Sequence, residues 1–293
     1  MRLDPNLSEW LNLLARWFHV FAGILWVGTT YYFTWLDARL SEAEAHSNTG
    51  DKPQVWMVHS GGFYVVEKQK QPGTLELHWF RWEAALTWLS GMVLLVLIYY
   101  MGGALVDADV GEKFVRWIAK LPYAGSIIAP YLSTHYDGFA VAFSIGLLVV
   151  GGIVYDLLIK SPLGKNEFAF AAVAYVLLVG VAYLLTHVLS GRAAYIQMGA
   201  LLGTLMVANV WMHILPAQRR MIAATGAGQT PDARLAAQAK LRSKQNTYMV
   251  VPVVFTMISN HFPTATYGSR YDWIILSILI LVGWVAAKLI RRA

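Results

Sequence analysis

Long apolar runs separated by shorter polar segments dominate the chain. A bilayer core about 30 Å thick requires roughly 20 consecutive apolar residues in a helix. About seven runs approach this length. We therefore predict an all-α fold, a polytopic transmembrane helix bundle with about seven spans, or eight if a weaker run also crosses. The predicted spans are residues 10–36, 82–101, 139–159, 168–189, 193–215, 248–267 and 273–290.

The weaker run, residues 114–132, is interrupted by charges and prolines. It carries Arg116, Lys120, Pro122 and Pro130, which suit an interfacial amphipathic helix better than a crossing. Neither an internal repeat nor a linker long enough to divide domains is evident. We expect residues 1–293 to form a single membrane domain, with segments 37–81 and 216–245 as its cytoplasmic loops.

Composition narrows the possible chemistry. Of the 293 residues, 57% are apolar and 14% are charged, which is typical of an integral membrane protein. Cysteine is absent, which excludes disulfides, iron–sulfur clusters and the attachment of c-type haem. Any redox centre must then be held by histidine or methionine. The formal charge of +6 gathers beside the spans, so nucleic acid is not the expected partner.

Charge also predicts the orientation. The segment 216–245 and the carboxyl-terminal tail are rich in basic residues, and the positive-inside rule places both in the cytoplasm. An odd number of spans then puts the amino terminus outside and the carboxyl terminus inside. The basic residues are Arg219, Arg220, Arg234, Lys240, Arg242, Lys244, Lys288, Arg291 and Arg292.

Three histidines fall at one predicted depth. A rise of about 1.5 Å per residue puts His19 and His261 each roughly 10 Å from the outer face, and His187 is slightly shallower. Polar groups at this depth are functional-site hypotheses. We expect any two of the three to ligate a non-covalent bis-histidine haem b; a three-histidine metal site and simple hydrogen bonding are the alternatives. Arg16 and Arg192 can pair with haem propionates or with lipid headgroups.

A second group of polar and aromatic residues lies at the inner side. The segment "LHWFRWEAALTWLSG", residues 77–91, brings Trp79, Arg81 and Glu83 together where the second span begins. We interpret it as a pocket for a planar anion, with Glu83 as a desolvated base. An aromatic interface belt with Arg81 at the headgroups, and an ion pair of Glu83 with Arg81 or Lys68, are the alternatives.

We assign further residues to the same inner site because they offer hydrogen-bond donors or aromatic surfaces for stacking. In "HSGGFY", residues 59–64, the paired glycines let the backbone approach a ligand or turn sharply. The additional candidates are His59 as a catalytic residue and Tyr64, Arg219, Asn246 and Tyr248 as substrate-binding residues.

Several segments together resemble the membrane domain of the bacterial membrane-bound urate oxidase (urate hydroxylase) family. They are "HSGGFYVVEK", "HWFRWEAALTWLSG", "SPLG", "LSGRAA", "ANVWMHILPAQRR" and "RSKQNTYMVVPVVFTMISNHFP". The resemblance implies a bacterial inner-membrane enzyme that oxidises urate, or a similar planar purine, to 5-hydroxyisourate and delivers electrons to cytochrome c. Better-known members of the family carry a cytochrome c domain after the membrane part. The given sequence does not include such a domain, so we expect either a separate cytochrome c as acceptor or a lost or changed activity.

The sequence departs from the family pattern at Ser60, Ala217 and His213. Two other functions therefore stay open at this point. One is a b-type cytochrome that relays electrons between a quinone and cytochrome c. The other is a haem-free membrane subunit or transporter.

Overall fold

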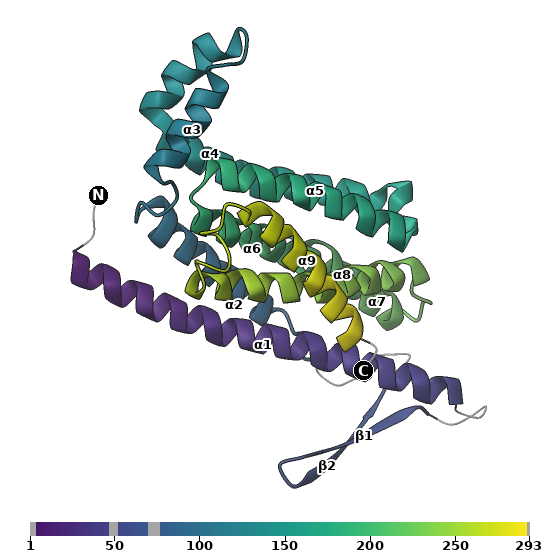
Figure 1. Cartoon of the computed structure of the whole chain (residues 1–293). Coiled ribbons are helices and arrows are strands. Elements are labelled where there is room, and N and C mark those ends of the chain that lie inside the picture. Colours follow the sequence, from purple (N-terminus) through teal and green to yellow (C-terminus); the bar gives the residue numbers. More distant parts are fainter. Residues whose placement is uncertain (1–3, 47–51, 70–76, 292–293) are drawn as a thin grey trace.

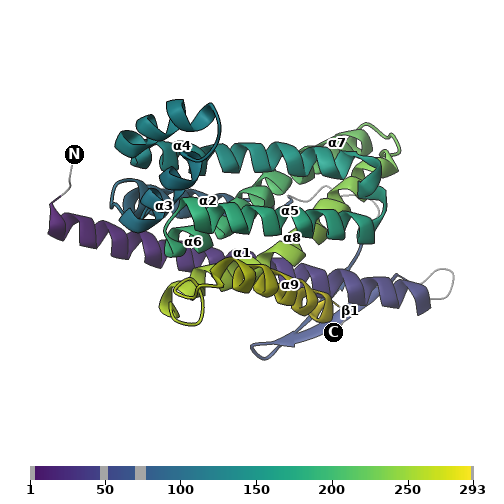
Figure 2. The same cartoon turned by 45° about the horizontal axis from the view of Figure 1, so that its top comes forward.

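The computed structural model describes residues 4–46, 52–69 and 77–291, and it confirms the predicted all-α bundle (Figures 1 and 2). The elements are α1 (Pro5–His46), β1 (Gln54–His59), β2 (Gly62–Glu67), α2 (Trp82–Leu94), π-helix η1 (Leu95–Tyr100), α3 (Ala108–Ile118), α4 (Ala124–Lys160), 3₁₀-helix η2 (Pro162–Lys165), α5 (Glu167–Val188), α6 (Gly191–Ala208), π-helix η3 (Asn209–Ile214), α7 (Leu215–Gly226), α8 (Ala233–Ile258), 3₁₀-helix η4 (Ser259–His261) and α9 (Asp272–Ile290).

Six of the helices in the described part of the chain are long and apolar enough to cross a membrane. The first, α1, has 42 residues and is about 63 Å long, so it extends well past both ends of the predicted span 10–36. The segment 114–132, expected as one interfacial helix, is divided. Its first residues belong to α3, and the rest begin α4, which bends at His135 because that residue leaves helical geometry (φ −127°, ψ 25°).

The predicted span 248–267 differs most from the structure. Helix α8 starts earlier, at Ala233, where the Asp232 side chain caps it by accepting a hydrogen bond from the Arg234 amide. It ends at Ile258, and Phe262, which precedes Pro263, has left helical geometry (φ −131°, ψ 58°). The charged first half of α8 and its early end keep it out of the six apolar helices.

Packing nevertheless runs α8 alongside the whole of α6. Asn246 of α8 bonds to Asn209 directly after α6, and Asn260 directly after α8 bonds to Arg192 at the start of α6. The two helices are therefore antiparallel and equally deep in the bundle. We call the two ends of the bundle the Arg192 end and the Arg242 end.

Helix α6 lies at the centre of the molecule. It contacts α2, α4, α5 and α8, while α1 packs mainly on α2 at the opposite side from α5 (Figure 1). Tyr195, Gln197 and Met198 are fully buried on α6. A methyl group at Gly199 would lie 2.2 Å from Thr256 Oγ1, so this glycine allows α6 and α8 to approach closely.

A β-hairpin projects from the bundle beside the second half of α1 (Figure 1). It is not among the elements predicted from the sequence. Strands β1 and β2 pair antiparallel from Gln54↔Glu67 to His59↔Gly62. The turn places Ser60 at φ 50° and Gly61 at φ 77°, a left-handed geometry that closes tight hairpins and favours glycine. The glycines of "HSGGFY" thus serve a sharp turn.

Candidate functional site

Arg81 and Glu83 bring unpaired polar atoms into the interior where α2 begins. Arg81 Nε and Glu83 Oε2 are both buried and have no hydrogen-bond partner in the described part of the chain. Lys68, one of the two expected partners of Glu83, instead pairs with Asp37 at 2.9 Å. Within residues 4–46, 52–69 and 77–291, neither Arg81 nor Glu83 forms an ion pair. Unpaired buried groups of this kind indicate that a partner is missing.

Flat aromatic rings surround this pair. Trp79 packs against a cluster formed by Ala84 of α2, Val210 of η3 and Leu215 of α7. The Trp82 ring lies 6.0 Å from that of Trp211, edge to face. The guanidinium of Arg81 lies 5.5 Å from the centre of the Trp82 ring. A forked cationic donor, a carboxylate and aromatic rings thus occur within a few residues of the start of α2.

The remaining predicted substrate residues lie elsewhere. His59 and Tyr64 are exposed on the hairpin, and Arg219 is exposed on α7. Tyr248 lies beneath the guanidinium of Arg291, 5.8 Å from it. The Asn246 side chain is buried with both of its ends hydrogen-bonded, to Asn209 and to the Met206 carbonyl. Only Trp79, Arg81 and Glu83 therefore gather at one place.

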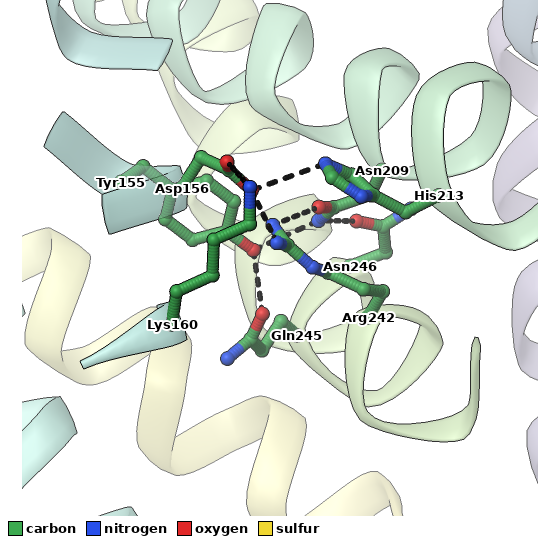
Figure 3. A network of polar contacts seen from close by, with 8 residues as sticks. All are labelled: Tyr155, Asp156, Lys160, Asn209, His213, Arg242, Gln245 and Asn246. Atoms are coloured by element: carbon green, nitrogen blue, oxygen red, sulfur yellow. Dashed lines mark hydrogen bonds and ion pairs between the residues drawn. The ribbon is translucent and has the colours of Figure 1, made fainter. Parts of the chain in front are cut away.

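The Arg242 end contains a polar network centred on Asp156 of α4 that sequence reasoning missed (Figure 3). Arg242 of α8 is only 5% exposed and forms an ion pair with Asp156 Oδ1. His213 Nε2 lies 3.2 Å from the same oxygen, and Lys160 Nζ lies 2.5 Å from Asp156 Oδ2. Both carboxylate oxygens of Asp156 thus contact basic side chains of the protein itself.

The network continues through neutral side chains. Arg242 Nη1 donates to Asn209 Oδ1 at 3.1 Å, and Asn209 Nδ2 donates to Asn246 Oδ1 and to the Tyr155 hydroxyl, each at 2.8 Å. Tyr155 in turn donates to Gln245 Oε1 at 2.6 Å. These bonds join α4, η3 and α8 across the bundle. Because its members satisfy one another, we interpret this network as structural support for the neighbouring aromatic site.

At the Arg192 end, His19 is held in one orientation against α2. Its Nδ1 lies 3.0 Å from the Thr87 carbonyl and 3.0 Å from Ser90 Oγ. A side chain at Gly91 would come within 3.1 Å of the ring, so the glycine makes room for the imidazole. The Thr87 carbonyl can only accept, so Nδ1 carries the proton and Nε2 is left as a free ligand atom. A metal-binding histidine is typically oriented by this kind of contact.

The other two histidines have different surroundings. His187 is exposed on α5, where its Nδ1 donates to the Tyr183 carbonyl at 2.7 Å, on the opposite side of the bundle from α1 (Figure 1). His261 is exposed on η4 and has no hydrogen-bond partner among the described residues. No group of three or more histidine, aspartate or glutamate side chains within those residues is placed to hold a metal ion.

Arg192 lies against the buried Tyr99, while the exposed Arg16 donates to Asn12 Oδ1 at 3.1 Å. The Arg192 guanidinium lies 5.9 Å from the centre of the Tyr99 ring, and the charges of both arginines act on the Tyr99 hydroxyl. Arg192 Nε also donates to Asn260 Oδ1 at 3.1 Å, directly beside His261. Arg16 precedes His19 by about one helical turn. Arg192 therefore connects the surroundings of Tyr99 with those of His261, and the two arginines are candidates to pair with the propionates of a haem held by His19 and His261.

Comparison with known proteins gives one match. A family model described as "Urate oxidase N-terminal" matches residues 5–292. No curated protein and no solved structure matches the chain.

Proposed function

The chain belongs to the urate oxidase N-terminal family, and on this premise we propose that it is a membrane-bound oxidoreductase of the urate hydroxylase type. It oxidises urate to 5-hydroxyisourate at the Trp79–Arg81–Glu83 site and passes the electrons to a separate cytochrome c. The observation that carries the proposal is the pair of buried, unpartnered atoms, Arg81 Nε and Glu83 Oε2, beside aromatic rings.

Urate matches this pair chemically. It is a flat purine that is anionic near neutral pH, so Arg81 can donate to it in its plane while Trp79 or Trp82 stacks on its face. Such contacts also restore the hydrogen bond that each buried atom lacks. Substrates without a negative charge would leave the Arg81 guanidinium uncompensated, which favours an anionic purine over a neutral one.

The reaction requires a base and an electron acceptor. Urate and one water give 5-hydroxyisourate, two protons and two electrons. Glu83 is the group placed to accept a proton, because its buried Oε2 has no hydrogen-bond partner among the described residues. The two electrons must reach a cytochrome c, which is a one-electron acceptor, in separate transfers.

His19 and His261 are the residues that would hold a haem b, with Arg16 and Arg192 pairing with its propionates. When bound, this group supplies a one-electron carrier between the substrate and the acceptor. Glu83 and Gly91, on which His19 packs, are separated by about 12 Å along the same helical segment. Glu83 and the Gly91 contact of His19 therefore lie on one helix, α2.

An optical spectrum of the purified protein tests the proposal. We expect a Soret band and split visible bands after dithionite, and partial reduction by urate alone without oxygen. A haem spectrum that urate leaves unchanged would favour a b-type cytochrome without urate chemistry. Absence of any visible band would contradict the haem and favour a haem-free subunit.

Point variants test the substrate residues and the proposed haem ligands separately. Glu83→Gln keeps the shape of the side chain but removes the base, so we expect urate-dependent reduction to slow by about 10²- to 10⁴-fold with the haem spectrum intact. Glu112→Gln, an exposed glutamate of α3, is the matched control.

His261→Ala should abolish the bis-histidine spectrum, whereas His187→Ala should leave it unchanged. The reverse pattern would contradict the ligand assignment.

A further inference from the structure

The two faces of the β-hairpin differ in what they contact. The strand register puts Val55 and Met57 on one face with Val66 and Tyr64 opposite them. The other face carries the cross-strand pairs Trp56↔Val65 and Val58↔Phe63. These four apolar side chains, which we call the outer face, are 68%, 46%, 68% and 82% exposed in that order. A charge-free patch of this kind indicates a binding surface.

The inner face fixes how the hairpin lies along α1. Val55 packs with Leu36 and Leu40, and Tyr32 donates a hydrogen bond to Met57 Sδ at 3.6 Å. Val55 and Met57 are about 7 Å apart along the strand, and their contacts Leu36 and Tyr32 are about 6 Å apart along α1 but in the reverse chain order. The hairpin therefore runs back along α1, from its carboxyl-terminal half toward the apolar segment.

Polarity changes along the outer face in the same direction. The base of the hairpin holds Gln54 and Glu67, which are hydrogen-bonded to each other, and the apolar pairs follow toward the turn. Lys68 Nζ lies 2.9 Å from Asp37 Oδ1, and Lys240 Nζ of α8 lies 3.1 Å from Asp37 Oδ2. The base is thus charged and tied to α1 and α8, whereas the apolar part lies level with the end of the apolar segment of α1.

We propose that the outer face of the hairpin docks into the headgroup region of the lipid bilayer. The exposed apolar surface of α1 beside it, including Tyr32 and Phe33, leads directly to this depth. A two-stranded hairpin has unpaired backbone groups at both edges, which prevents entry into the hydrocarbon core. The headgroup region satisfies those groups while it accepts Trp56 and Phe63, because aromatic side chains favour this zone.

The absence of cysteine from the sequence permits single-site labelling of the whole chain. We would place an environment-sensitive fluorophore at Val58→Cys on the outer face and reconstitute the protein in lipid nanodiscs. Lipids carrying a nitroxide near the top of the acyl chain would serve as quenchers. The controls are Gln54→Cys at the base of the same face and Gln229→Cys, which is exposed between α7 and α8.

The label at residue 58 should be quenched several-fold more strongly than the labels at residues 54 and 229, and its emission should shift to shorter wavelength. Equal, weak quenching at all three positions would overturn the proposal. Shielding of residue 58 that appears only in discs holding two copies of the chain would assign the face to a second copy instead, and would also overturn it. All three positions are exposed, so loss of folding is not expected.

Discussion

Arg242 and Lys160 illustrate how burial decides the importance of a charge. Both pair with Asp156, yet Arg242 is 5% exposed and the Lys160 side chain is 63% exposed. Removing Arg242 leaves Asp156 with Lys160 and His213, but it deprives the buried Asn209 Oδ1 of its donor, which typically costs about 1 to 3 kcal/mol. Removing the exposed partner costs about 0 to 1 kcal/mol.

We therefore expect Arg242→Met to lower the free energy of unfolding by roughly 1 to 3 kcal/mol, and Lys160→Met to lower it by about 1 kcal/mol or less. Thermal unfolding of the two variants in the same detergent measures the difference. Equal losses would show that Asp156 does not depend on its buried partner.

At this scale, the sequence can suggest a candidate site where its residues are neighbours in the chain. Trp79, Arg81 and Glu83 lie within five residues of one another, so one short segment contains the candidate site. Arg242 was read as a basic residue of a solvated loop, because its partner Asp156 is 86 positions away. Asp156 itself, a charge inside the predicted span 139–159, was the signal that could have revealed the network.

At the scale of elements, the crossing of α6 and α8 depends on a residue without a side chain. A methyl group at Gly199 would clash with Thr256, whereas one at Gly203 would meet nothing within 4 Å. We expect Gly199→Ala to destabilise the protein by about 1 to 3 kcal/mol through overpacking. Gly203→Ala should be neutral or stabilise by up to about 1 kcal/mol, because alanine favours helix.

Unfolding midpoints of the two alanine variants test this expectation on the same helix. A Gly199→Ala midpoint at or above that of the parent would mean that α6 and α8 separate at little cost. Comparison of the urate-dependent spectra would then show whether the aromatic site tolerates the separation.

The elements themselves were predictable to different degrees. Apolar runs gave the helices, because a helix in a bilayer must be apolar over a known length. The hairpin was missed, although "QVWMVH" and "GFYVVE" are rich in β-branched and aromatic residues around a Ser–Gly turn. The glycines and aromatic residues of these segments are also typical of a ligand site, and that interpretation was preferred. The end of α8 was misplaced because hydropathy alone does not register Pro263.

At the scale of the whole molecule, α8 decides the sidedness of the carboxyl terminus. It is long enough to span but too polar to count among the six apolar helices, and it runs the full depth of α6. Arg291, just past α9, donates to Thr247 of α8 at 2.8 Å, so α9 returns to the Arg242 end. We expect the loop around Gln229 and the carboxyl terminus to lie on the same side of the membrane.

A membrane-impermeant thiol reagent can check this arrangement in sealed vesicles. Gln229→Cys and a cysteine appended to the carboxyl terminus should react from the same side, while Asp109→Cys on exposed α3 should react from the other. Reaction of the first two from opposite sides would mean that α8 does not cross.

The length of α1 has a mechanical consequence. It is roughly twice as long as a bilayer core is thick, and it packs mainly on α2. It can therefore act as a lever that pivots at that crossing. A tilt of about 10° would displace a point roughly 30 Å along the rod by about 5 Å. Small adjustments at the His19 contact would thus be magnified at the far tip of the rod.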